Sequence, residues 1–127
     1  MPAVRRLVIV VWSAGPERPV LAAAPFVYAL AARALDAEVE MHFTSTAVRW
    51  LFAGEAARAY TDAARTKTVA DFIREAKVAG VRLLACGMAL AEHRRGAEAL
   101  IAECDGHAGA ATVMAAALEP ESRVLVF

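Results

Sequence analysis

A cysteine between a predicted strand and a predicted helix has the clearest chemical potential in this 127-residue chain. Cys86 follows the apolar run at 81–85 and precedes Gly87 and Met88, where a helix-like segment begins. Free N–H groups and the dipole at a helix start stabilise a thiolate, which is the reactive form. Gly87 leaves the backbone open to an approaching sulfur or oxyanion. The pattern predicts a reactive thiol, although a small buried packing residue would give the same local sequence.

Polar residues also follow the first two predicted strands. Ser13 comes after the apolar run at 7–12, and Thr44 comes after the run at 39–43. The carboxyl ends of parallel strands lie at one edge of a sheet, where ligands collect. We therefore expect Ser13, Thr44, Gly87 and Met88 to bind substrate beside Cys86, while turn and helix-cap roles remain open for Ser13 and Thr44.

The second cysteine, Cys104, lies three residues before His107, a spacing that can hold a metal. A zinc site needs about four ligands, or three and a water molecule. His42 and His93 are too scattered along the chain to be assigned to such a set. We expect no metal and no cofactor, and Cys104 could instead resolve an oxidised Cys86.

Apolar periodicity predicts an alternating order of strands and helices. The first run is continuous and rich in β-branched residues, which is typical of a strand covered on both faces of a parallel sheet. This order predicts one domain over residues 1–127, a three-layer α/β/α sandwich with a mostly parallel sheet of about five strands. We expect strands at 7–12, 39–43, 81–85, 99–102 and 124–127, and helices at 19–36, 47–52, 68–79, 88–94 and 108–118.

Composition excludes several classes of function. The formal net charge is zero, which argues against bulk attraction to nucleic acid or to an anionic membrane. No stretch approaches the roughly 20 apolar residues that cross a bilayer, and the N-terminal apolar run is short for a signal peptide. We therefore expect a cytoplasmic protein with two reduced cysteines. The sequence lacks G-x-G-x-x-G, P-loop, C-x-x-C and G-x-S-x-G motifs.

Three stretches of the chain resemble the DsrE/DsrF-like family of small sulfur-handling α/β proteins. They are RLVIVVWSAG with the strand AEVEMHFT, then GVRLLACGMAL, and finally GHAGAATVMAAALEPESRVLVF. The resemblance implies a five-stranded sheet and places Cys86 at the position that carries persulfide sulfur in active members. It also implies sulfur donor and acceptor proteins as partners, and a homo-oligomer, commonly a trimer or hexamer.

The leading hypothesis is a sulfur carrier, or sulfurtransferase-like protein, that holds sulfane sulfur as a persulfide on Cys86. A non-catalytic module that binds a small ligand or a protein is one alternative, with Cys86 as a packing residue. A thiol redox sensor with Cys104 as the resolving cysteine is another. Trp12, Trp50 and Phe52 stand near the ends of predicted elements, and they predict apolar surface that a second copy would cover.

Overall fold

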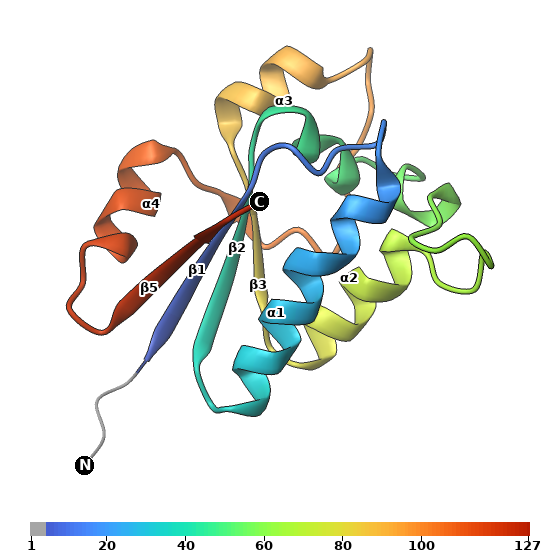
Figure 1. Cartoon of the computed structure of the whole chain (residues 1–127). Coiled ribbons are helices and arrows are strands. Elements are labelled where there is room, and N and C mark those ends of the chain that lie inside the picture. The colour runs from blue at the N-terminus through green and yellow to red at the C-terminus, as the bar shows by residue number, and fades with distance from the viewer. Residues whose placement is uncertain (1–4) are drawn as a thin grey trace.

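The computed structural model describes residues 5–127, and its centre is a sheet of five parallel strands in the order β4-β3-β2-β1-β5 (Figure 1). Among these residues every strand pairing is parallel. The strands are β1 (Arg6–Val11), β2 (Glu38–Phe43), β3 (Arg82–Ala85), β4 (Gly106–His107) and β5 (Ser122–Val126). The helices are α1 (Ala23–Ala34), α2 (Val69–Val78), α3 (Gly87–His93) and α4 (Ala110–Ala117), with 3-10 turns η1 (Pro19–Ala22), η2 (Ser45–Leu51) and η3 (Ala56–Arg58).

One face of the sheet carries the main core beneath α1 and α2. Ile9, Met41 and Leu83 point to this face from three neighbouring strands and are fully buried. Phe26 of α1 and Phe72 of α2 stack above them with ring centroids 5.7 Å apart. Burial of each such side chain contributes roughly 1.5–3 kcal/mol, so this face holds the sheet and its two helices together.

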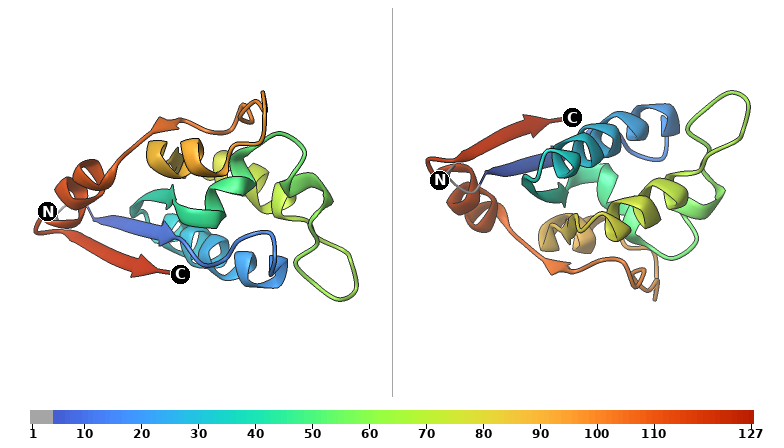
Figure 2. Two further views of the ribbon diagram at one scale, coloured as in Figure 1. Left: turned by 90° about the horizontal axis from the view of Figure 1, so that it is seen from above. Right: turned by 90° about the horizontal axis from the view of Figure 1, so that it is seen from below.

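The opposite face has a thinner cover, because α4 is the helix that packs there, against β1 and β5 (Figure 2). Five of the eight residues of α4 are alanine, so the helix buries little apolar surface. Helices on both faces confirm the predicted α/β/α sandwich with a parallel sheet. The thin layer also brings polar groups of β2 under a single short helix, as described below.

The predicted strand at 99–102 is wrong. Leu100 forms an isolated antiparallel bridge with Phe52, and the N–H of Ile101 donates to the carbonyl of Leu51 at 2.8 Å. Leu100 and Ile101 are partly buried against the core. The apolar run thus reflects packing on the η2 segment rather than membership of the sheet.

The fourth strand is instead β4, inside the segment predicted to be a loop. Asp105 places it: its carboxylate accepts the N–H of Leu83 at 2.7 Å, and its own N–H donates to the Leu83 carbonyl at 2.8 Å. The next residue, Gly106, then pairs with Leu84. Two paired residues are too short to produce an alternating pattern, so periodicity could not reveal this strand.

Two helix starts follow the expected chemistry. Thr68 and Asp71 form a reciprocal capping box at the start of α2, inside the helix predicted at 68–79. Pro25 lies in the first turn of α1, where its missing N–H costs no hydrogen bond. The predicted helix at 47–52 is the 3-10 turn η2, and its Trp50 is buried with Nε1 donating to the carbonyl of Ala14 at 2.6 Å.

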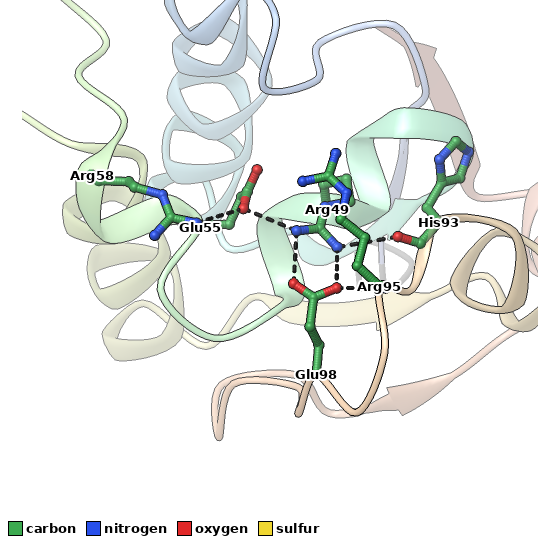
Figure 3. A network of polar contacts seen from close by, with 6 residues as sticks. All are labelled: Arg49, Glu55, Arg58, His93, Arg95 and Glu98. Carbon is green, nitrogen blue, oxygen red and sulfur yellow. Dashed lines mark hydrogen bonds and ion pairs between the residues drawn. The ribbon is translucent and has the colours of Figure 1, made fainter.

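A buried guanidinium joins η2 to the far end of α3 (Figure 3). Arg49 Nη1 donates to the carbonyl of His93 at 3.1 Å, and Nη1 and Nη2 hold the two oxygens of Glu98 at 2.5 and 2.8 Å. Arg49 Nη2 also donates to Glu55 Oε2 at 3.0 Å. These bonds attach the last residue of α3 and the loop after it to η2, so they hold in place the helix whose N-cap is Cys86.

The hydrogen bond from Arg49 lowers the pKa of Glu98 to about 2. A carboxylate whose pKa is lower in the folded chain than in the unfolded chain stabilises the fold above its unfolded pKa. Its contribution is complete above pH ~4.5 and is lost as the pH falls toward 2. Acid therefore weakens the attachment of α3 only as the pH falls toward 2, after carboxylates with ordinary pKa values have been protonated.

We predict that Arg49→Met lowers the free energy of unfolding by about 3 kcal/mol at pH 7, because it leaves carboxylates without their buried cation. Arg74→Met is the matched control, since Arg74 pairs with Asp71 on the exposed side of α2 and its loss costs under about 1 kcal/mol. Urea unfolding followed by circular dichroism gives both values. Equal losses in the two variants would contradict the assigned role of Arg49.

Candidate functional site

Cys86 joins the carboxyl end of β3 to the start of α3. Its N–H donates to the carbonyl of Phe43 at 2.9 Å, which extends the β2–β3 ladder by one residue. Its carbonyl accepts the N–H of Leu90 at 2.9 Å and begins the helix. The residue is therefore held by main-chain bonds on both sides, and its partly exposed side chain lies at the sheet edge where ligands collect.

The surroundings of the Cys86 thiol favour its charged form. Burial raises its pKa, but the backbone N–H of Ala89, the hydroxyl of Thr44 and the backbone N–H of Met88 outweigh burial and lower it. These contacts fall short of regular capping bonds, since the Cys86 side chain makes no cap hydrogen bond to α3. They act on the thiolate, whose negative charge attracts the helix N–H groups.

The thiol opens into a cavity of about 200 Å³ between the sheet and α4. His42 lines it from β2, Thr44 lines it from the position just after β2, and Val10 lines it from β1. Gly109 and Ala110 close it at the start of α4, together with Val113 and the half-exposed Met114. The cavity suits one small group beside the sulfur, surrounded by mostly apolar walls.

The structure brings together some of the predicted site residues and separates others. Thr44 lies directly beside Cys86 and lines the cavity. Gly87 and Met88 follow the thiol on the exposed side of α3: a Cβ at Gly87 would meet no atom within 4 Å, and Met88 is 85% exposed. Ser13 lies outside the cavity lining and donates its N–H to the carbonyl of Phe127. Substrate binding by these four residues stays a prediction.

A buried Glu40–His42 contact was not assigned from the sequence, and its histidine lines the same cavity. His42 is 3% exposed and Glu40 is 7% exposed, and His42 Nε2 lies 3.0 Å from Glu40 Oε1. Within the described part of the chain His42 Nδ1 has no hydrogen-bond partner. Leaving such a buried atom unpaired costs about 1–3 kcal/mol. The signal was the spacing, because residues two apart on a strand point to the same face.

A comparison with known families matches residues 6–127 to the DsrE/DsrF-like family. The chain belongs to the DsrE/DsrF-like family. A solved structure of a protein of unknown function from Methanobacterium thermoautotrophicum superposes with a TM-score of 0.63 and 18% sequence identity. The match covers 98% of this chain and 100% of that one, and it shows a shared fold. A search of curated proteins found no match.

Cys104 of this DsrE/DsrF-like chain lies far from the Cys86 cavity along the sheet. Cys104 precedes Asp105, whose N–H donates to the carbonyl of Leu83, three residues before Cys86. At about 3.3 Å per residue, three residues of strand span roughly 10 Å. A disulfide needs Cα atoms within about 7 Å, so a Cys86–Cys104 bridge would require backbone movement.

Residues 5–127 contain no group of three or more His, Cys, Asp or Glu side chains placed to hold a metal ion. They also contain no helix that is long and apolar enough to cross a membrane.

We predict that an alkylating reagent modifies Cys86 faster than Cys104 at pH 7. The pKa of Cys86 is lowered, whereas burial raises the pKa of Cys104, so the Cys86 thiolate forms at lower pH. Thr44→Val should slow the alkylation of Cys86 about threefold by removing one group that stabilises the thiolate. Peptide mass spectrometry over a range of pH measures the rate at each cysteine.

Thr112→Val on the exposed side of α4 is the matched control and should leave the Cys86 rate unchanged. Equal rates for Cys86 and Cys104 in the native chain would show that the Cys86 thiol is an inert packing residue.

Proposed function

We propose that this protein carries sulfane sulfur as a persulfide on Cys86. The thiolate attacks the outer sulfur of a donor persulfide, R–S–SH. The sulfur–sulfur bond of the donor breaks as the new bond to Cys86 Sγ forms, and the donor leaves as a thiolate. An acceptor thiolate later attacks the outer sulfur of Cys86–S–SH, which returns the Cys86 thiolate. The exchange needs no external oxidant or reductant.

The observation that carries this proposal is the lowered pKa of a partly exposed thiol that opens into a small cavity. A carrier needs a thiolate at neutral pH and room for one added sulfur atom. Membership of a family to which sulfur-handling proteins belong supports the same reading. Access from one side also suits partner proteins that reach the sulfur in turn, and we propose such donor and acceptor proteins in the cytoplasm.

The two alternative functions make different demands on Cys86. A purely structural cysteine in a binding module would be shielded, and its pKa would not be lowered. A two-cysteine redox sensor would need Cys104 within bridging distance, which the strand register argues against. Both alternatives fit the site less well than a carrier does.

We predict that incubation with cysteine persulfide adds about 32 Da, the mass of one sulfur atom, to the native protein through its Cys86 thiolate. Treatment with dithiothreitol should remove this mass, because a thiol accepts the outer sulfur. Intact-mass spectrometry under non-reducing conditions provides the measurement. Cys86→Ser should gain no mass, and Cys104→Ser is the matched control that should load like the native chain.

If the native protein stays unloaded, or if Cys86→Ser loads equally well, Cys86 is not a sulfur carrier.

We further propose a homo-oligomer, a trimer or hexamer, built on the β5 side of α1. Trp12 is 52% exposed and Tyr28 is 54% exposed. The ring centroids of Tyr28 and Phe127 lie 5.7 Å apart, and the N–H of Trp12 donates to the carbonyl of Phe127. Three neighbouring aromatic residues beside an edge strand form apolar surface that a second copy could cover. Trp50 and Phe52, also expected to mark open surface, are instead fully buried and contribute nothing to it.

We predict that light scattering at micromolar concentration gives a mass above that of one chain, 13.5 kDa. Tyr28→Glu should lower this mass by placing a charge in the aromatic surface. Tyr60→Glu, a comparable change at an exposed tyrosine near α2, is the control. A monomeric native chain would refute the proposed assembly.

A further inference from the structure

His42 is a buried ionisable residue whose free nitrogen belongs to the Cys86 cavity. The ring is 3% exposed and lines the cavity, while Nδ1 has no partner among residues 5–127. Its other nitrogen, Nε2, is occupied by Glu40 Oε1 at 3.0 Å. An ionised carboxylate only accepts hydrogen bonds, so Nε2 carries a hydrogen and the neutral ring keeps a lone pair on Nδ1. Nδ1 is thus prepared to take up a proton.

Strand register places His42 behind Cys86 on the same face of the sheet. Phe43 pairs with Ala85, so Thr44 stands opposite Cys86, and His42 stands opposite Leu84. Residues on one face of neighbouring strands that are offset by two positions lie about 7–8 Å apart. A persulfide places a second sulfur about 2.05 Å beyond Sγ. The added sulfur therefore extends from Cys86 into a cavity that the imidazole already lines.

The charges around His42 would balance if a cationic imidazole faced an anionic sulfur. Glu40 contacts the ring on its own strand, and Arg82 of β3 lies 3.9 Å from Glu40 Oε2. In the described chain β1 offers Val8 and Val10 on this face, and α4 has no ionisable side chain. With Glu40 and the sulfur negative, and His42 and Arg82 positive, the four charges sum to zero.

We propose that His42 is the proton-exchanging residue of the Cys86 cavity, that it pairs with the outer sulfur of the Cys86 persulfide, and that Glu40 positions its ring. This role rests on the proposed carrier function. Among residues 5–127, His42 is the ionisable side chain that lines the cavity beside Cys86, since the other lining residues are apolar or carry only the Thr44 hydroxyl. Glu40 acts through His42 and does not touch the sulfur.

The proton balance of the transfer follows from this pairing. Cys86 thiolate attacks the outer sulfur of R–S–SH, and R–S⁻ departs as a thiolate. The outer sulfur, still protonated as Cys86–S–SH, gives its proton to the neutral ring at Nδ1. The sum is R–S–SH plus Cys86–S⁻ and neutral imidazole, giving R–S⁻ plus Cys86–S–S⁻ and imidazolium. One sulfur–sulfur bond breaks and one forms, and no electrons are gained or lost overall.

The pairing can be tested without any sulfur donor protein. Cys86 of the otherwise native Cys104→Ser chain is converted to a mixed disulfide with 4-thiopyridine, and hydrosulfide then displaces the thiopyridine to leave Cys86–S–S⁻. Nitrogen-15 NMR of the histidine rings at pH 7 follows His42. We expect the Nδ1 resonance to move from the unprotonated to the protonated range on loading. A His42 spectrum that is the same in loaded and unloaded protein would overturn the pairing.

Variants test the transfer step itself. His42→Gln keeps a polar group beside Glu40 but cannot exchange a proton near neutral pH. We expect it to load from cysteine persulfide about 100-fold more slowly than the native chain, and to lose the low-pH limb of the rate profile. Glu40→Gln should slow loading less and shift that limb. His107→Gln, at an exposed histidine on β4, is the matched control with native rate and profile.

A His42→Gln chain that loads at the native rate with the native pH profile would overturn the role of His42 even though Cys86 carries sulfur. A native chain that accepts no sulfur from cysteine persulfide but shows the His42 shift when loaded chemically would instead overturn the carrier function alone. The NMR measurement keeps Glu40 and His42 as native residues, so it tests the pairing of His42 with the outer sulfur even where a variant fails to fold.

Discussion

The parallel pairing of β2 with β3 is the constraint on which the site depends. Its last bond, from the N–H of Cys86 to the carbonyl of Phe43, fixes where the strand ends and the helix begins. The same register puts Thr44 opposite the cysteine and His42 two residues behind it. A slip of one residue would turn both side chains to the core face, because side chains alternate along a strand. Main-chain geometry, rather than contacts among the side chains, therefore assembles the cavity.

The two faces of the sheet differ in their contents: one holds the main apolar core, and the other holds the Cys86 cavity. The face beneath α1 and α2 is filled with large apolar side chains, and any charge there would lack a partner. The other face is covered by an alanine-rich helix that leaves a cavity of about 200 Å³. The burial of Glu40 and His42 there is partly compensated by the contact between His42 Nε2 and Glu40 Oε1, and Arg82 approaches Glu40 from β3. The hydrogen bonds from Arg49 to the His93 carbonyl and to Glu98 hold the end of α3, and these residues do not line the cavity.

The sequence predicts the strands and helices that contribute most buried apolar surface, and it proposes Cys86 as the candidate reactive thiol. Long apolar runs and the Thr68 cap carry strong local signals, so β1, β2, β3 and α2 are found close to their observed bounds. β4 is missed because its position depends on a side chain, Asp105, that bonds to a strand distant in sequence. Trp50 is misjudged for a similar reason, since its burial depends on the carbonyl of Ala14 and the packing of η2.

The Glu40–His42 pair shows what kind of site local patterns leave out. A glutamate and a histidine two residues apart in a strand are ordinary on a solvated face, and here both are buried. Once the pair is buried, His42 Nδ1 is an acceptor without a donor among residues 5–127, which costs free energy that a bound donor would recover. In the proposed carrier, an anionic sulfur paired with a protonated ring would satisfy Nδ1, whereas a neutral sulfur would leave it without a partner. That pairing would also hold the charged sulfur away from water, which is why the proposal places it beside His42.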